Sequence, residues 1–335
     1  MSAPDDHSDL PPFTGMALDR APVERKDPQW VRRLLDDPAT RAVTATREGV
    51  VMTNRGNPVL RRSDLPALDG DEPILLGLED GSAVFAVDLD ALPEAARSEA
   101  IAGAEVVPLR EAGVVLAPAE AGLAAYAIAL LNWHRRHRFC ANCGARTVVA
   151  EAGYSRHCPR CGADHFPRTD PCVIMTVAHD DRLLLGRRAG WPPGRLSVLA
   201  GFVSPGESAE EAVIREVFEE SGIVARDPVF VASQPWPFPA SLMLGFHAAS
   251  DGGEPRARDG ELEEVRWVER DVVLRALQGD ESFRLPPGVS IARFLVERWA
   301  RDAVAQAGDS RCDEPPERAA SPADAGPGGS PSRRG

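Results

Sequence analysis

The chain has 335 residues, of which 43% are hydrophobic and 27% are charged, a composition typical of a globular protein with two or three domains. A formal net charge of −13 at pH 7 argues against sequence-independent binding to bulk nucleic acid, and an anionic substrate would need local neutralisation by metal ions and arginines. No signal peptide is visible at the N-terminus, and the longest apolar run, residues 121–131, is too short to span a bilayer. We therefore expect a cytoplasmic protein with no membrane partner.

The first two segments show no catalytic pattern. Residues 1–15 are polar and rich in proline, so a flexible arm is expected. Residues 16–136 are expected to form an N-terminal α+β domain to which the sequence assigns no chemistry. Its predicted strands cover 43–53, 73–78 and 83–87, and its predicted helices cover 94–103 and 120–136.

Two C-x-x-C pairs follow, Cys140 with Cys143 and Cys158 with Cys161. Pairs at this separation are typical of a tetrahedral Zn²⁺ site with four thiolate ligands, which has no open coordination position and therefore a structural role. Disulfides or a redox dithiol are the rival interpretations, and an intracellular chain favours zinc. We place this zinc ribbon at residues 137–166 and expect it to brace the neighbouring domains, although its arginines make nucleic-acid binding conceivable.

Residues 167–306 are expected to form the last domain, followed by a disordered tail at 307–335 that is rich in Pro, Gly, Ser and charge. Strands are predicted at 171–178, 183–187, 197–203, 229–233, 242–248 and 265–268, and helices at 209–220, 271–277 and 290–305. Of the two remaining cysteines, Cys172 is expected to be buried in a strand and Cys312 to lie in the tail.

The stretch from Gly201 to Ile223 predicts a strand end, a tight loop, one helix and a helix stop. Pro205 and Gly206 favour the turn. Ser208 and Glu207 suit the helix N-terminus, and Gly222 can adopt positive φ and end the helix.

Three carboxylates of this helix, Glu216, Glu219 and Glu220, are spaced three and four residues apart and lie near one face. A hard divalent cation, Mg²⁺ or Mn²⁺, prefers carboxylate oxygens and would offset their repulsion. Arg215 stands four residues before Glu219 and can orient it through a charge-assisted hydrogen bond. The alternative, a solvated acidic face, does not explain the flanking glycines.

A second unusual stretch lies between two predicted strands and reads S-Q-P-W-P-F-P-A-S from Ser233 to Ser241. Its three alternating prolines cannot belong to a central strand, because none of them donates to the ladder. Trp236 and Phe238 offer flat apolar surface, and Gln234 offers hydrogen bonds, so the loop suits a nucleotide base or nicotinamide. From the residues alone, a packed loop with no ligand is an equal alternative.

These motifs together resemble the Nudix hydrolases: Gly201 to Ile223 matches the Nudix box at every constrained position. The S-Q-P-W-P-F-P-x-S stretch and a preceding four-cysteine site resemble the NADH pyrophosphatases, also known as NAD-capped RNA hydrolases. The resemblance implies an α+β chain with a Nudix α/β/α sandwich and mixed sheet, preceded by the zinc ribbon and the N-terminal domain, and a homodimer.

The implied activity is metal-dependent hydrolysis of NADH or NAD⁺ to nicotinamide mononucleotide and AMP. Removal of NAD caps from RNA 5′ ends by the same chemistry is the main alternative. A nucleotide-sensing regulator that binds without cleaving, or a diphosphatase for nucleoside-diphosphate sugars, is less well supported.

The resemblance also implies roles for single positions. Glu216 and Glu220 would be metal ligands, with Glu219 as ligand or base beside Arg215. Ala200, through its carbonyl, and Glu261 match further ligands for Mg²⁺ or Mn²⁺. The substrate site would be lined by Phe166, Phe202, Gln234, Pro235, Trp236, Pro237, Phe238, Pro239, Ala240, Ser241 and Ala292.

Overall fold

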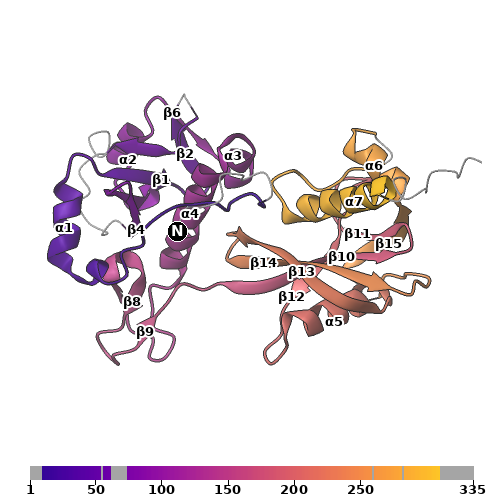
Figure 1. Cartoon of the computed structure of the whole chain (residues 1–335). Helices are drawn as coiled ribbons and strands as arrows, with labels where there is room; N and C mark the ends of the chain where they lie inside the picture. Colours follow the sequence, from indigo (N-terminus) through magenta and orange to yellow (C-terminus); the bar gives the residue numbers. More distant parts are fainter. Residues whose placement is uncertain (1–9, 54–55, 62–73, 259, 281–282, 310–335) are drawn as a thin grey trace, which may run out of the picture. The chain divides into compact units, whose positions relative to one another are not determined.

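The computed structural model describes residues 10–53, 56–61, 74–258, 260–280 and 283–309 (Figure 1). The predicted tail beyond residue 309, the position of Cys312 and the first nine residues of the predicted arm lie outside the described residues. The described part carries three sheets, two of six strands and one of three. Of the helices that the structure describes, none combines the length and the apolar character that crossing a bilayer requires.

The first sheet belongs to the N-terminal part of the chain and has the strand order β4-β5-β1-β2-β6, with β3 beside β1. The pairing of β1 with β5 is parallel and the others are antiparallel. Its strands are β1 (Arg41–Ala45), β2 (Val50–Thr53), β3 (Val59–Arg61), β4 (Ile74–Glu79), β5 (Ser82–Asp88) and β6 (Ala104–Val107).

Helices cover this sheet, and the longest of them, α4 (Pro118–Arg136), supplies much of the core. The other helices are α1 (Pro28–Asp36), α2 (Glu94–Ala100) and α3 (Leu109–Val115), with short 3-10 turns at Glu24–Lys26 and Leu89–Ala91. The predicted strand over 43–53 is in fact the hairpin of β1 and β2, turning at Arg47 and Glu48. Helices α1 and α3 were not among the predicted elements, although Asp27 followed by Pro28 is an N-cap signal and the Asp27 side chain accepts a hydrogen bond from the Gln29 amide.

The three-stranded sheet belongs to the cysteine-rich segment. It consists of β7 (Val148–Ala150), β8 (Ser155–His157) and β9 (Asp164–His165), in that order and antiparallel, with a 3-10 turn at Glu151–Gly153. So few residues cannot bury a sizeable core, and the segment therefore needs another source of stability.

The third sheet is mixed and has the order β13-β14-β10-β11-β15, with β12 also paired to β10. The β10–β14 pairing is parallel and the others are antiparallel. Its strands are β10 (Asp170–His179), β11 (Arg182–Arg188), β12 (Leu199–Phe202), β13 (Ala225–Trp236), β14 (Ser241–Ser250) and β15 (Leu262–Glu269).

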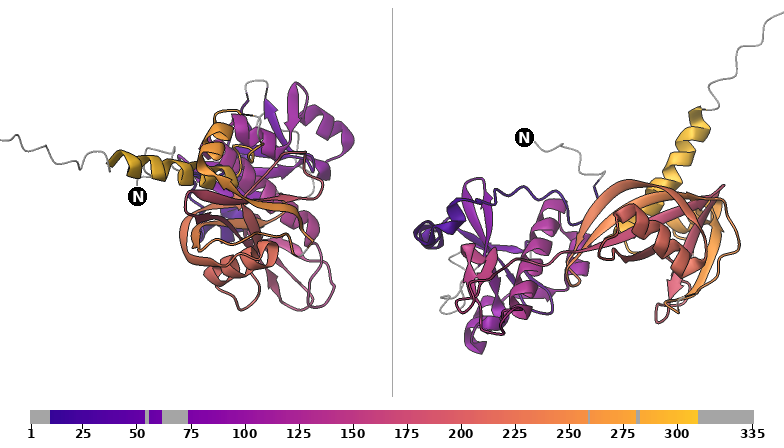
Figure 2. Two further views of the ribbon diagram at one scale, coloured as in Figure 1. Left: turned by 90° about the vertical axis from the view of Figure 1, so that its right-hand side faces the viewer. Right: turned by 90° about the horizontal axis from the view of Figure 1, so that it is seen from below.

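Alternation along β10 assigns a helix layer to each face of this sheet. Val173, Met175 and Val177 pack in one cluster with α5 (Ala209–Ser221), whereas Ile174 packs in another with α6 (Arg270–Leu277) and α7 (Ile291–Asp309). Figures 1 and 2 show α5 on the face of the sheet opposite α6 and α7. The predicted α/β/α sandwich with a mixed sheet is confirmed.

The proline-rich stretch enters the sheet further than predicted, because β13 extends through Pro235 to Trp236. β13 stands at the end of the strand order, so a residue without an N–H is tolerated there. Helix α7 begins at Ile291 and runs to Asp309, past the limit of 306 that the sequence suggested for the last domain.

Candidate active site

The acidic helix α5 is fixed at both ends by local hydrogen bonds. Gly206 has φ of 93° in the preceding turn. Ser208 Oγ accepts from the Glu211 amide at 3.2 Å, and the Glu211 carboxylate accepts from the Ser208 amide at 2.8 Å. At the other end, Gly222 has φ of 74° and donates its amide to Phe218. The loop-helix-loop prediction is confirmed, and it gives the carboxylates a rigid support.

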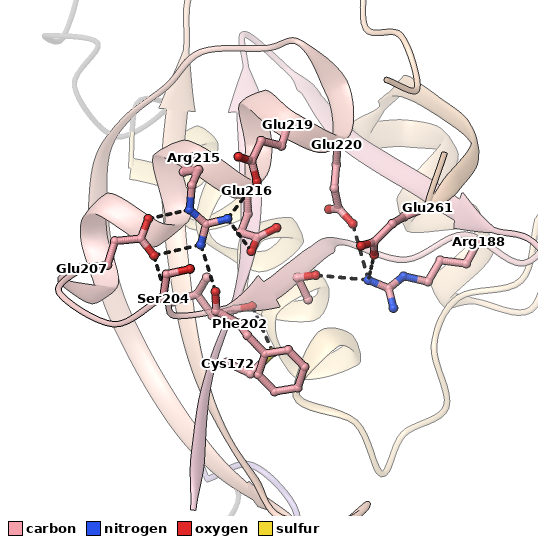
Figure 3. A network of polar contacts seen from close by, with 12 residues as sticks. Cys172, Arg188, Phe202, Ser204, Glu207, Arg215, Glu216, Glu219, Glu220 and Glu261 are labelled. Carbon is pink, nitrogen blue, oxygen red and sulfur yellow. Dashed lines mark hydrogen bonds and ion pairs between the residues drawn. The ribbon is translucent and has the colours of Figure 1, made fainter. Parts of the chain in front are cut away.

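Arg215 is the centre of one network in the site (Figure 3). Its guanidinium donates to both carboxylate oxygens of Glu207, and its Nη1 donates to Glu216 and to Glu219, each at 2.8 Å. Its Nη2 also donates to the Phe202 carbonyl at 2.9 Å. The predicted Arg215–Glu219 contact is present, and Arg215 also ties α5 to the loop before it and to the end of β12.

The Arg215 guanidinium holds the pKa of the Glu207 carboxyl at about 2, below its ordinary value of 4.5, and the Ser204 amide adds to the effect. Glu207 was noted in the sequence only as a suitable residue for a helix N-terminus. Its pairing with Arg215, eight residues on, depends on how the loop folds back, so spacing alone could not have found it.

A glycine is needed at position 201 because the Glu216 carboxylate packs directly against its Cα, and not because the backbone has a positive φ there. A Cβ at this position would lie 1.9 Å from Cδ of Glu216 and 2.2 Å from each carboxylate oxygen. No side chain fits here while the Glu216 carboxylate stays in place, which explains the glycine at the strand end.

Arg188 is the centre of a second network beside the first (Figure 3). Its Nη2 lies 3.4 Å from the Ala200 carbonyl oxygen, 3.1 Å from Glu261 and 3.5 Å from Glu220. Glu220 is only 2% exposed, and a buried carboxylate requires a positive partner. One cationic nitrogen therefore reaches three oxygens that the resemblance assigns to a metal, although they come from distant parts of the chain.

The charge balance favours additional cations at this place. Five carboxylates, those of Glu207, Glu216, Glu219, Glu220 and Glu261, face two guanidinium groups, which leaves three negative charges. Oxygen donors from carboxylates and a carbonyl form the ligand set that Mg²⁺ and Mn²⁺ prefer. The residues present thus fit a divalent metal.

Cys172 lies in β10 directly opposite Phe202, and burial together with the Glu216 charge raises the pKa of its thiol to about 11. The prediction that Cys172 is buried in a strand is confirmed, and it remains a neutral thiol at physiological pH. Phe202 is 58% exposed beside it and offers a free ring face next to the acidic cluster.

Gln234 differs from its predicted surroundings. It is fully buried, and its amide nitrogen donates to the carbonyls of Pro12 and Val289, each at 2.9 Å. Its amide oxygen accepts from the Ile291 amide at 2.8 Å, at the start of α7. All the hydrogen bonds therefore run to main chain, and Gln234 ties the proline-rich loop to both the N-terminal arm and α7. Ala292, the next residue of α7, is likewise buried at 2% exposure and packs in the core.

The two aromatic rings of the loop pack on the N-terminal part of the chain. Phe13 lies 6.2 Å from Trp236 and 6.4 Å from Phe238 between ring centroids. The Arg110 guanidinium stands over both rings, 4.4 Å from the centroid of Phe238 and 5.4 Å from that of Trp236. Phe13 is 2% exposed, so this part of the predicted arm is packed. Nothing in the sequence linked Phe13 or Arg110 to the loop.

A cavity of about 430 Å³ brings several predicted substrate residues together. Phe166 lines it with Pro235, Trp236, Pro237, Ala240 and Ser241, while Tyr126 and Arg20 line it from the N-terminal domain. Gln234 and Ala292 do not line this cavity, and Phe202 belongs to the acidic cluster.

Strand register connects this cavity with the acidic cluster. Ser241 is opposite Asp170, and two residues on, Met243 is opposite Cys172, which is itself opposite Phe202. Extended chain rises about 3.3 Å per residue and neighbouring strands lie about 4.8 Å apart, so Ser241 lies roughly 12 Å from Phe202. A dinucleotide is long enough to span both places.

The four predicted zinc ligands form one cluster. Their sulfur atoms all lie within 4.8 Å of one another, and both knuckles repeat the same turn, with Gly144 and Gly162 donating to the carbonyls of Cys140 and Cys158. No disulfide joins them. His165 Nε2 lies 3.3 Å from the Cys140 sulfur, as a supporting group outside the ligand set.

The thiols of this cluster respond to one another. Backbone amides of Cys161 and Arg160 lower the pKa of Cys158 to about 6. The Ala163 amide acts to lower the pKa of Cys161, but the other three cysteine sulfurs outweigh it and raise that pKa to about 12. Four thiolates this close together repel one another, a cation between them would offset that repulsion, and the set fits Zn²⁺ in a closed structural site.

Comparison with protein families finds three matching models. A NUDIX domain matches residues 167–286, a NADH pyrophosphatase-like rudimentary NUDIX domain matches residues 33–133, and a NADH pyrophosphatase zinc ribbon domain matches residues 135–166. The N-terminal sheet and the four-cysteine segment thus fall within models of their own.

Among curated proteins, the chain is similar to the NAD-capped RNA hydrolase NudC of Mycobacterium bovis BCG, with 46% identity over 240 residues, 68% of this chain and 75% of the relative. The NudC of Mycobacterium tuberculosis H37Rv is 45% identical over the same shares of both chains. The NAD-capped RNA hydrolase NUDT12 of Homo sapiens is 43% identical over 194 residues, 54% of this chain and 42% of that protein.

Proposed function

Because the chain belongs to the Nudix hydrolases, within the NADH pyrophosphatase and NAD-capped RNA hydrolase group, we propose that it hydrolyses the pyrophosphate of NADH or NAD⁺. The products are nicotinamide mononucleotide and AMP. The observation that carries the proposal is the convergence of the Ala200 carbonyl, Glu220 and Glu261 on one cationic nitrogen, with Glu216 and Glu219 alongside.

Bound Mg²⁺ or Mn²⁺ would offset the charge of the phosphates and make water more acidic. Ala200, Glu216, Glu220 and Glu261 would hold these ions. Glu220 is buried and suits a ligand, whereas the Glu219 side chain is 50% exposed and can pass a proton to solvent. We therefore assign Glu219 as the base: water gains a bond to phosphorus, the bridging P–O bond breaks, and the proton of the water passes to the carboxylate.

The positioning groups are Arg215 and Arg188. Arg215 holds Glu216 and Glu219 in one orientation, so they need no reorganisation when substrate arrives. Arg188 lies among the oxygens of Ala200, Glu220 and Glu261 that would hold a metal, and its positive charge would attract a phosphate of the substrate. The cavity beside the proline-rich loop, which Phe166 and Trp236 line, is proposed to hold one nucleoside of the dinucleotide.

Product analysis tests the reaction. We expect NADH with Mg²⁺ or Mn²⁺ to give AMP and the reduced mononucleotide in equal amounts. Release of nicotinamide, or no cleavage with either metal, would contradict the proposal.

A matched pair of substitutions on α5 tests the site. Glu220→Gln should lower kcat by at least about 10²-fold with zinc content and folding unchanged, because a metal ligand is lost. Glu210→Gln on the exposed first turn of the same helix removes the same charge and should leave kcat within twofold. Near-normal turnover of Glu220→Gln would refute the ligand assignment.

The second candidate is removal of NAD caps from RNA, the activity for which the similar proteins are named. It uses the same bond cleavage, so rates on free NADH and on a capped transcript must be compared. A homodimer, a cytoplasmic location and domain limits at 16–136, 137–166 and 167–306 remain parts of this proposal.

A further inference from the structure

A cleft of about 560 Å³ lies beside the tip of the proline-rich loop, away from the acidic cluster. Pro237, Phe238 and Pro239 form one side of it. The other side comes from the end of α4, which supplies Asn132, Arg135 and Arg136, and from the β1–β2 turn, which supplies Arg47. Among the residues that the structure describes, no acidic side chain lines this cleft, in a chain whose net charge is −13.

One arginine of the cleft is structural. Arg135 is only 9% exposed in its side chain and bonds both carboxylate oxygens of Asp88, at 2.7 and 2.5 Å. It also donates to Asn132 Oδ1 at 3.2 Å, which fixes that amide and leaves its NH₂ group for another acceptor. Asp90, the other acid nearby, pairs with Arg97 at 3.1 Å and reaches Arg135 at 3.5 Å. The charges of Asp88 and Asp90 are thus balanced by Arg97 and Arg135. Neither Arg47 nor Arg136 takes part in these ion pairs.

Arg47 and Arg136 are exposed, and neither forms an ion pair with an acid in the part of the chain that the structure describes. Glu48 follows Arg47 in sequence but does not line the cleft. Two guanidinium groups without acidic partners, a fixed amide donor and the ring of Phe238 therefore share one concave surface. Guanidinium groups and amides bind phosphate oxygens, and an aromatic ring stacks with a base.

We propose that this cleft binds the phosphodiester backbone of the RNA that follows an NAD cap. The inference rests on the proposed function. Pro239 lies in the turn that leads into β14 at Ser241, and Ser241 is roughly 12 Å from Phe202 across two strands, so the cleft lies beside the loop and apart from the acidic cluster. In this proposal a free dinucleotide occupies the acidic cluster and the cavity lined by Phe166 and Trp236, which neither Arg47 nor Arg136 lines, whereas an attached transcript continues into the cleft.

The test compares two double variants with the same charge change. Arg47→Ala with Arg136→Ala removes the unpaired cations, and Arg32→Ala with Arg33→Ala removes two exposed arginines of α1 as the control. Each is measured for kcat/KM on an NAD-capped single-stranded transcript and on free NADH, at 50 and 200 mM salt. Binding of a labelled 5′-monophosphate RNA 20-mer is measured separately by fluorescence anisotropy.

The cleft variant should lose about tenfold or more in kcat/KM on capped RNA at 50 mM salt and stay within twofold on NADH. Its log–log salt dependence of RNA binding should flatten by about 1.4, because a single-stranded contact contributes about 0.7 per phosphate. An equal loss on both substrates, an equal loss in the control, or unchanged RNA binding would overturn the proposal. If the wild type cleaves neither substrate but the cleft variant alone loses RNA binding, the proposed function fails and the cleft assignment stands.

Discussion

Replacement of Gly201 by alanine tests whether the geometry at the strand end controls the chemistry. The new Cβ would meet Cδ of Glu216 at 1.9 Å, whereas ordinary contacts begin near 3.4 Å, so the carboxylate must retreat by about 1.5 Å. Gly201 does not have the left-handed backbone conformation that strains other residues, so β12 itself accepts alanine. The strain therefore falls on the side chain of Glu216, a proposed metal ligand, and not on the fold.

The retreat should break the 2.8 Å hydrogen bond between Arg215 and Glu216 and move a carboxylate oxygen that we propose as a metal ligand. A displacement of about 1 Å can cost about 10²-fold in rate, so we expect Gly201→Ala to lower kcat on NADH by about 10²-fold or more. The free energy of unfolding should change by no more than about 1 kcal/mol, because the clash involves the end of one side chain and alanine suits a strand better than glycine.

The assay is steady-state hydrolysis of NADH with urea unfolding in parallel. Gly288→Ala is the control, because a Cβ there meets nothing within 4 Å. Glu216→Asp shortens the side chain by about 1.5 Å and should relieve the clash, so adding Gly201→Ala to it should cost little. If Gly201→Ala keeps kcat within threefold, or if its effect is the same in the Glu216→Asp background, the reasoning is refuted.

Three more measurements probe the hydrogen bonds and the cysteine cluster. Glu207 has a lowered pKa in the folded chain, so its stabilising effect is fully present above pH 4.5 and is lost as the pH falls toward 2. The difference in unfolding free energy between the wild type and Glu207→Gln should therefore shrink over that pH range. A constant difference would contradict the pairing of Glu207 with Arg215. Gln234→Leu leaves three main-chain groups without their partner, two of them buried and the Pro12 carbonyl half-buried, and should cost about 3 kcal/mol of unfolding free energy in urea. Gln278→Leu, at an exposed position, should cost less than about 0.5 kcal/mol, and equal costs for the two variants would contradict the burial argument. Chelation of zinc, or Cys143→Ser, should release one zinc per chain and expose the remaining thiols of the cluster to alkylation, which mass spectrometry can map. Cys172 should stay protected, because it is buried and the pKa of its thiol is about 11. Protection of the whole cluster after chelation would argue against a zinc site.

Local spacing explains what the sequence predicted well. Helix α5, its Ser208 cap and its Gly222 end depend on contacts within four residues, and so does the placing of Glu216, Glu219 and Glu220 on one helix. The same holds for each C-x-x-C knuckle. Helix α1 has an equally local start signal, Asp27 before Pro28, and is therefore also predictable from the sequence.

The amino-acid sequence by itself determined the acidic helix, the cysteine knuckles and the stiffness of the proline-rich loop, since each follows from neighbours along the chain. Only the tertiary structure decided that Arg188 reaches Glu261, 73 residues away, and that Gln234 bonds Pro12, 222 residues away. Arg188 and Glu261 meet because of strand order and register, which depend on how the whole sheet buries its two faces and not on the spacing of any one motif. Pro12 meets Gln234 because the segment around Phe13 packs against the proline-rich loop. For the same reason Gln234, which the sequence predicted to contact substrate, instead hydrogen-bonds main-chain groups of Pro12, Val289 and Ile291 in the folded molecule.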